Sequence, residues 1–133
     1  MALIEEFGFT VRDGQEEAFQ KWLEENEERF REVHPPGIRY LGTYGVVFSS
    51  EKQAGLYRVL LELDNYGSID TMSTALKDAD SEFGRMVREH SSFTTADPNM
   101  PWSQSLYRTV VDMAVYDLPT PPGITGERGG DSS

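Results

Sequence analysis

The chain contains no cysteine in its 133 residues, which excludes disulfides, zinc sites built on thiolates and catalysis by a thiol. It also contains no apolar run near the roughly 20 residues that span a bilayer. The first six residues include two glutamates, where a secretory signal would carry basic residues. We therefore expect a cytoplasmic protein without a membrane partner.

Basic residues are scarce, because 12 lysines and arginines stand against 23 aspartates and glutamates, for a formal net charge of −11 at pH 7. A field of this sign repels nucleic acids and anionic membrane surfaces, so neither is expected as a partner. The signatures of serine hydrolases, nucleotide-binding loops and zinc proteases are absent, and the glycine-rich stretch 123–130 follows no apolar strand. The sequence thus names no reaction and predicts no cofactor.

The two histidines fall short of a metal site. Zinc needs three or four converging ligands, and neither His34 nor His90 belongs to a ligand motif. Both are predicted near the C-terminal ends of helices, where the helix dipole favours a cation. We interpret them as helix-capping residues and predict no metal.

Two periodicities divide the chain into strands and helices. Alternating apolar and polar residues predict strands over 3–11, 38–48, 56–63 and 105–116, and apolar residues at helical spacing predict helices over 15–34 and 68–90. Asp13 and Glu16 have the spacing of a capping box at the start of the first helix. Residues 1–118 are expected to form one domain, and residues 119–133 a disordered polar tail.

The predicted element order is β-α-β-β-α-β, an α+β fold. Two right-handed crossovers in this order give a ferredoxin-like antiparallel sheet with both helices on one face. The other face of the sheet is then left without a cover, and what lies on that face decides the assembly.

Alternation with a period of two assigns each strand residue to one face of the sheet. Phe7, Tyr40, Tyr44 and Val59 belong to the nearly all-apolar face predicted under the helices, whereas Thr43 is predicted on the opposite, open face. Seven large apolar residues are also predicted on the open face: Ile4, Leu41, Val47, Leu56, Leu60, Leu106 and Val110. Leaving them in water would forgo roughly 1.5–3 kcal/mol each, so we predict that a second copy covers them in a homodimer.

The turn over residues 11–14 leads into a helix that carries aromatic residues, and the apolar third strand ends at Asp64, Asn65 and Tyr66. With the element order, these features resemble the dimeric α+β barrel superfamily, which contains the antibiotic-biosynthesis monooxygenases, the NIPSNAP-like proteins and the stress-responsive barrel proteins. The resemblance covers residues 1–118. It implies that two sheets close into a barrel, with ligands between sheet and helices or inside the barrel. Haem-degrading relatives carry an asparagine on the first strand, and this strand has none.

Charged side chains predicted on the open face form the candidate site. They are three arginines and three acids: Arg39, Arg58, Arg108, Glu6, Glu62 and Asp112. Arginine forks bind carboxylates and phenolates, and a glutamate in a dry site can move a proton. The catalytic candidates are Glu62, Arg58 and Arg108, and the ligand-binding candidates are Arg39, Asp112, Tyr107 and Trp102. In the alternative interpretation, which the equal charge numbers favour, these groups pair with one another across the dimer interface.

Two functions stay open. The first is a small-molecule-binding protein, in particular a cofactor-independent enzyme of monooxygenase or isomerase type acting on a small aromatic or polyketide-like substrate. It predicts a cavity of about 300 Å³ or more, reached past the loop 91–104. The second is a non-catalytic dimeric structural or protein-interaction module with a filled interior. Its acidic segment 13–34, with eight acids against three bases, would meet a basic partner.

Overall fold

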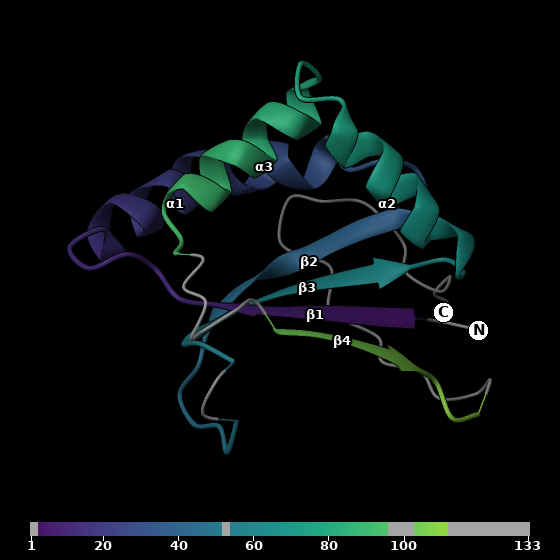
Figure 1. Ribbon diagram of the computed structural model, residues 1–133, viewed down its shortest axis with the longest axis horizontal. Helices are drawn as coiled ribbons and strands as arrows, with labels where there is room; N and C mark the ends of the chain where they lie inside the picture. The colour runs from purple at the N-terminus through teal and green to yellow at the C-terminus, as the bar shows by residue number, and fades with distance from the viewer. Residues whose placement is uncertain (1–2, 52–53, 96–102, 112–133) are drawn as a thin grey trace, which may run out of the picture.

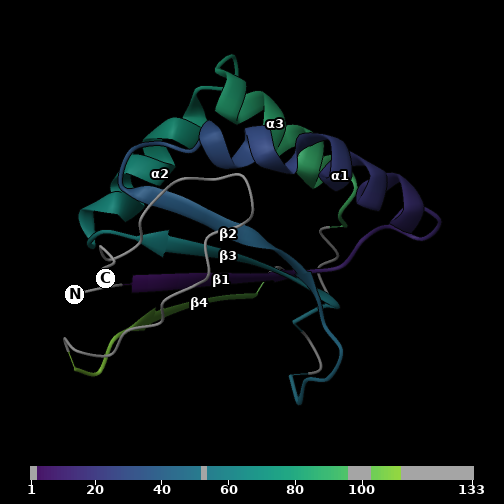
Figure 2. The ribbon, with the colours of Figure 1, turned by 180° about the vertical axis from the view of Figure 1, so that it is seen from behind.

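The computed structural model describes residues 3–51, 54–95 and 103–111. Its elements are the strands β1 (Leu3–Phe9), β2 (Ile38–Gly45), β3 (Tyr57–Leu63) and β4 (Ser103–Arg108), and the helices α1 (Glu16–Glu32), α2 (Gly67–Lys77) and α3 (Glu82–Ser92). The strands form one antiparallel sheet in the order β2-β3-β1-β4. All three helices lie on one side of it (Figures 1 and 2). The predicted α+β fold with a ferredoxin-like sheet is confirmed.

The second predicted helix is two helices, because polar residues interrupt it. Asp78 is the C-cap of α2. Ser81, which has an extended backbone, is the N-cap of α3, and its hydroxyl accepts a hydrogen bond from the Gly84 backbone N–H at 2.9 Å. Serine at this position satisfies a backbone donor that a continuous helix would have bonded internally. The first helix begins where the sequence indicated, but Gln15, not Asp13, is its N-cap and no side chain caps it.

A β-bulge in β2 changes which residues face the helices. Tyr40 pairs with Leu61, yet the next pair along the strand is Gly42 with Leu60, so Leu41 is an extra residue without a partner of its own. Residues beyond the bulge are therefore shifted to the opposite face. Thr43 faces the helices and Tyr44 lies on the open face, the reverse of what the sequence pattern predicted.

The register of β4 also reverses a prediction. Leu3 pairs with Arg108 and Ile4 pairs with Tyr107, and directly paired residues share a face. Arg108 and Leu106 therefore lie on the helix side of the sheet, so the prediction that they share the open face with Arg58 is wrong. The strand ends at Arg108, and from Ser105 onward every residue of it is exposed. Because neither face of this edge strand is buried, alternation carries little information on its orientation.

The core lies between the sheet and the helices. Its fully buried members include Leu3, Phe19, Tyr40 and Leu63, each less than 2% exposed. Within the described residues, no helix has the length and apolar composition that crossing a membrane requires. Residues 112–133 lie outside the described residues, so the boundary at residue 118 and the disordered tail stay predictions.

Candidate functional site

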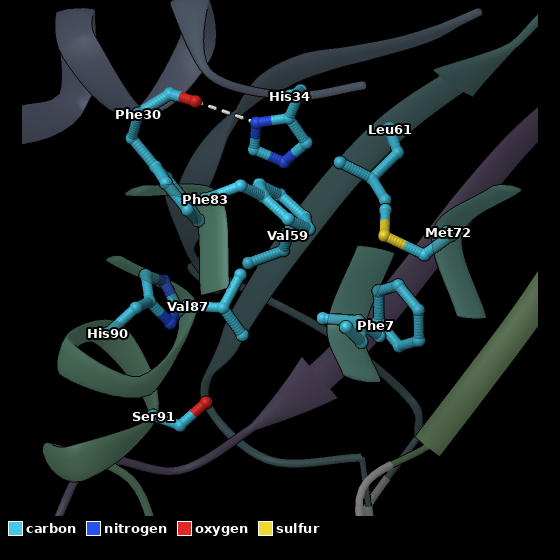
Figure 3. Close-up of a pocket in the computed structure, with 11 residues that line it drawn as sticks. Phe7, Phe30, His34, Val59, Leu61, Met72, Phe83, Val87, His90 and Ser91 are labelled. Atoms are coloured by element: carbon cyan, nitrogen blue, oxygen red, sulfur yellow. Dashed lines mark hydrogen bonds between the residues drawn. The ribbon is translucent and has the colours of Figure 1, made fainter. Parts of the chain in front are cut away.

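A cavity of about 190 Å³ opens between the sheet and the helices (Figure 3). Phe7, Val59 and Leu61 of β1 and β3 line its sheet side, and Met72 and Val87 line its helix side. The cavity is smaller than the roughly 300 Å³ expected from the sequence. It also lies on the opposite side of the sheet from the predicted arginine site.

The polar groups of the cavity are two histidines and Ser91; none of the described residues that line it is Asp, Glu, Lys or Arg. His34 follows α1, and its Nδ1 lies 2.7 Å from the carbonyl oxygen of Phe30, a contact visible in Figure 3. A carbonyl only accepts, so Nδ1 carries the proton. Burial lowers the pKa of His34, and this hydrogen bond opposes the shift in part. His34 therefore hydrogen-bonds a carbonyl of the last turn of α1, as a capping residue does, but its lowered pKa disfavours the cation that the helix dipole was predicted to favour.

His90 is buried, with 4% of its surface exposed. Its ring is surrounded by Phe9, Phe19, Trp22 and Phe30, with ring centroids 5.2–5.8 Å away. Burial, followed by the charge of the neighbouring His34, lowers the pKa of His90 to about 4. His90 is therefore neutral at pH 7, and the prediction that it caps its helix as a cation is wrong.

His90 contacts a hydrogen-bonded series that reaches the surface of α1. Its Nε2 lies 3.4 Å from Oγ1 of Thr43, which lies 2.5 Å from the hydroxyl of Tyr40. Tyr40 donates to Oε2 of Glu27 at 2.8 Å, and the backbone N–H of Thr43 donates to the same oxygen at 3.4 Å. Burial raises the pKa of Tyr40 far above its usual value, so the phenol stays protonated. Sequence reasoning missed this group because the bulge brings Thr43 inside.

The predicted charged residues of the open face bond within one chain. Arg39 forms an ion pair with Glu62, and Nε of Arg58 lies 3.7 Å from Oε2 of Glu6. The side chain of Arg58 is only 12% exposed, and its Nη1 donates to three backbone carbonyls, those of residues 54, 55 and 57, at 2.8–3.0 Å. Arg58 thus ties the start of β3 to the preceding turn through Nη1.

The remaining candidate residues do not lie on one face of the sheet. Tyr107 is on the open face, and its hydroxyl donates to Oε1 of Glu6 at 2.8 Å; this hydrogen bond raises its pKa. Arg108 lies on the opposite face. Trp102 and Asp112 lie outside the described residues. The structure therefore brings Arg58, Glu6 and Tyr107 together but separates Arg108 from them, and the functional roles assigned to these residues stay predictions.

One further carboxyl group was not singled out by the sequence. Glu5 lies on the helix side of β1 and is 4% exposed, and it accepts a hydrogen bond from Nε2 of Gln104 at 2.6 Å. The residues 3–51, 54–95 and 103–111 contain no group of three or more His, Asp or Glu side chains arranged to hold a metal ion.

No protein-family model matches the chain, and no curated protein matches it. Solved structures do match. A NIPSNAP family protein from Agrobacterium tumefaciens str. C58 aligns with 85% of this chain and 96% of its own, at a TM-score of 0.59 and 10% identity. An uncharacterized NIPSNAP-like domain protein from Burkholderia xenovorans aligns with 89% of this chain and 91% of its own, at a TM-score of 0.59 and 13% identity.

A conserved protein from Methanosarcina mazei Go1 also matches, with a TM-score of 0.52 and 17% identity over 81% of this chain and 92% of that chain. At these identities the likeness is one of fold. This chain therefore shares its fold with NIPSNAP family structures, a group that the sequence resemblance included.

Proposed function

We propose that this protein binds a small, uncharged aromatic molecule in the cavity between sheet and helices, and that it acts on this molecule without a cofactor. The observation that carries the proposal is an apolar cavity with a buried neutral imidazole in its wall. An apolar cavity of about 150 Å³ accommodates benzene. About 190 Å³ therefore matches a compound with one aromatic ring, such as a phenol or a small polyketide-like ring.

The charge of the ligand follows from the cavity wall. No ionised side chain of the described residues lines the cavity, and the pKa values of His34 and His90 are both lowered by burial. An anion in this space would be buried without a partner, at a cost of several kcal/mol. A neutral hydroxyl group, in contrast, can hydrogen-bond to a neutral imidazole, which is also a suitable group for proton transfer. The proposed chemistry is of the isomerase or oxygenase type that begins with deprotonation of the substrate, and the oxygen anion so formed has a partner in the imidazole N–H that the transfer creates.

The uncovered sheet face supports a homodimer as the working form. Ile4, Leu41 and Leu60 lie on this face half-buried, with Tyr44 and Tyr107 about half exposed beside them. A second copy can cover such a surface, because a two-fold axis brings the same residues to both sides of the interface. The alternative of a non-catalytic module predicts a filled interior, and the cavity favours ligand binding instead.

Calorimetric titration with p-cresol tests the proposal, with benzoate as a charged ligand of similar size. We expect p-cresol to bind and benzoate not to bind. Val87→Trp places an indole in the cavity and should abolish p-cresol binding, whereas Arg85→Trp makes the same substitution on the exposed side of α3 and should preserve it. Equal affinity of p-cresol for both variants, or no binding to the unmodified protein, would contradict the proposal.

A further inference from the structure

Four polar side chains form one hydrogen-bonded series that leads from the cavity toward the surface. It runs from His90 through Thr43 and Tyr40 to Glu27, with separations of 3.4, 2.5 and 2.8 Å between the bonded atoms. Tyr40 is 1% exposed and His90 is 4% exposed, whereas Glu27 is only partly buried. The series therefore has a dry end in the cavity wall and a solvated end on α1.

The carboxylate at the solvated end sets the direction of every hydrogen bond. An ionised carboxylate only accepts, so Tyr40 donates to Glu27. Because Tyr40 has only one O–H and donates it to Glu27, its oxygen accepts a hydrogen bond from the hydroxyl of Thr43. The hydroxyl of Thr43 also has only one proton, which it donates to Tyr40. Oγ1 of Thr43 therefore accepts from the imidazole of His90. A neutral imidazole carries one proton, which places it on Nε2 and leaves a lone pair on Nδ1.

We infer that Glu27, Tyr40 and Thr43 are positioning residues that hold His90 as its Nε2–H tautomer and thereby make its Nδ1 the proton acceptor of the cavity. The ring of His90 lies in the cavity wall near Val87 (Figure 3), and Nδ1 has no hydrogen-bond partner among the described residues. The inference rests on the proposed function for its ligand class, a one-ring aromatic compound that carries a hydroxyl group. Such a ligand brings a donor, which an acceptor at Nδ1 complements.

The same series can carry the ligand proton to solvent without a buried cation. The ligand O–H bond breaks as Nδ1–H forms, and Nε2–H breaks as the proton moves to Oγ1 of Thr43. The original hydroxyl proton of Thr43 passes to Tyr40, and that of Tyr40 passes to Oε2 of Glu27. Four bonds to hydrogen break and four form, and no electron is gained or lost. Glu27 ends as a neutral carboxylic acid, and the ligand carries the negative charge on its oxygen, which accepts a hydrogen bond from the new Nδ1–H. His90 ends as its other neutral tautomer, in agreement with surroundings that disfavour imidazolium.

The tautomer of His90 is measured directly by long-range proton–nitrogen correlation NMR on the full chain with isotope-labelled histidine, near neutral pH and without ligand. We expect an excess of the Nε2–H form of about tenfold, the size of one buried hydrogen bond. Tyr40→Phe removes the link to Glu27 and frees the Thr43 proton for Nε2, so the excess should disappear or invert. Glu27→Gln, at the partly exposed end, replaces a carboxylate that only accepts by an amide that can accept or donate. It should therefore reduce the excess of the Nε2–H tautomer.

Glu89→Gln is the matched control. Glu89 lies next to His90 in sequence but on the exposed side of α3, where it accepts from the Trp22 indole at 2.9 Å. This substitution should leave the tautomer ratio unchanged. A proton on Nδ1 in the unmodified protein, or a ratio that neither Tyr40→Phe nor Glu27→Gln alters, overturns the inference. Because no ligand is present, a failure of p-cresol to bind would instead contradict the proposed function.

Discussion

Acidification should destabilise the fold through His90. The imidazole is enclosed by four aromatic rings, and burial lowers its pKa to about 4, whereas histidine in an unfolded chain titrates near 6.5. The folded state therefore favours the neutral form. The resulting stability is fully present above about pH 6.5, is lost progressively as the pH falls, and is gone below about pH 4.

The size of the effect follows from the two pKa values. Each unit by which they differ corresponds to about 1.4 kcal/mol. As the pH falls from 7.5 to 5, the number of extra protons that the unfolded chain binds at this residue rises from about 0.1 to nearly one. Integrated over that interval, the free energy of unfolding should fall by about 2 kcal/mol through His90 alone, and by about 3 kcal/mol once the pH is below 4.

Urea unfolding, followed by tryptophan fluorescence at one fixed protein concentration, measures this loss. His90→Gln cannot titrate, so its free energy of unfolding should fall by about 2 kcal/mol less than that of the unmodified protein between pH 7.5 and pH 5. His34→Gln is the comparison variant, because His34 also has a lowered pKa and its charge contributes to the shift of His90. If His90→Gln and the unmodified protein lose the same free energy, His90 is not a buried neutral imidazole.

Two substitutions on the open face test the assembly and the arginine site. Leu60→Glu should raise the dissociation constant of the homodimer by about 100-fold or more in sedimentation equilibrium, because it buries a charge at the interface; an unchanged constant would place the interface elsewhere. Arg58→Ala should lower the free energy of unfolding by about 1–3 kcal/mol, because three backbone carbonyls and Glu6 lose their partner. Its p-cresol affinity should stay within about twofold, and a large loss would restore Arg58 as a ligand-binding residue.

The architecture was predictable in part because the buried central strand β3 has clear alternation. In β3, Val59, Leu61 and Leu63 are buried while the residues between them are not, so the faces were assigned correctly there. The edge strand β4 gave no such signal, since from Ser105 onward it is exposed on both faces and only its pairing with β1 sets its orientation. The break between α2 and α3 involves local hydrogen bonds of Asp78 and Ser81, which compete with those of a continuous helix.

The candidate site was harder to predict, because its parts are distant in sequence and a bulge rearranges them. His90 and Tyr40 were visible as a helical histidine and a core tyrosine, but nothing in the sequence linked them. Thr43, which joins them, was assigned to the wrong face because alternation cannot reveal an unpaired residue. Charges were the more conspicuous signal, yet Arg39 and Glu62 neutralise each other within the chain.

The extra residue at Leu41 affects how distant homologues should be aligned. Deleting that residue would remove the irregularity while Gly42, Thr43 and Tyr44 kept their partners on β3 and hence their orientation. Relatives one residue shorter at this point would then preserve the same interior, although an ungapped comparison would match their interior threonine to the wrong column. An alignment with a single gap at Leu41 would show whether a relative has a hydroxyl-bearing residue at the position of Thr43, which contacts His90.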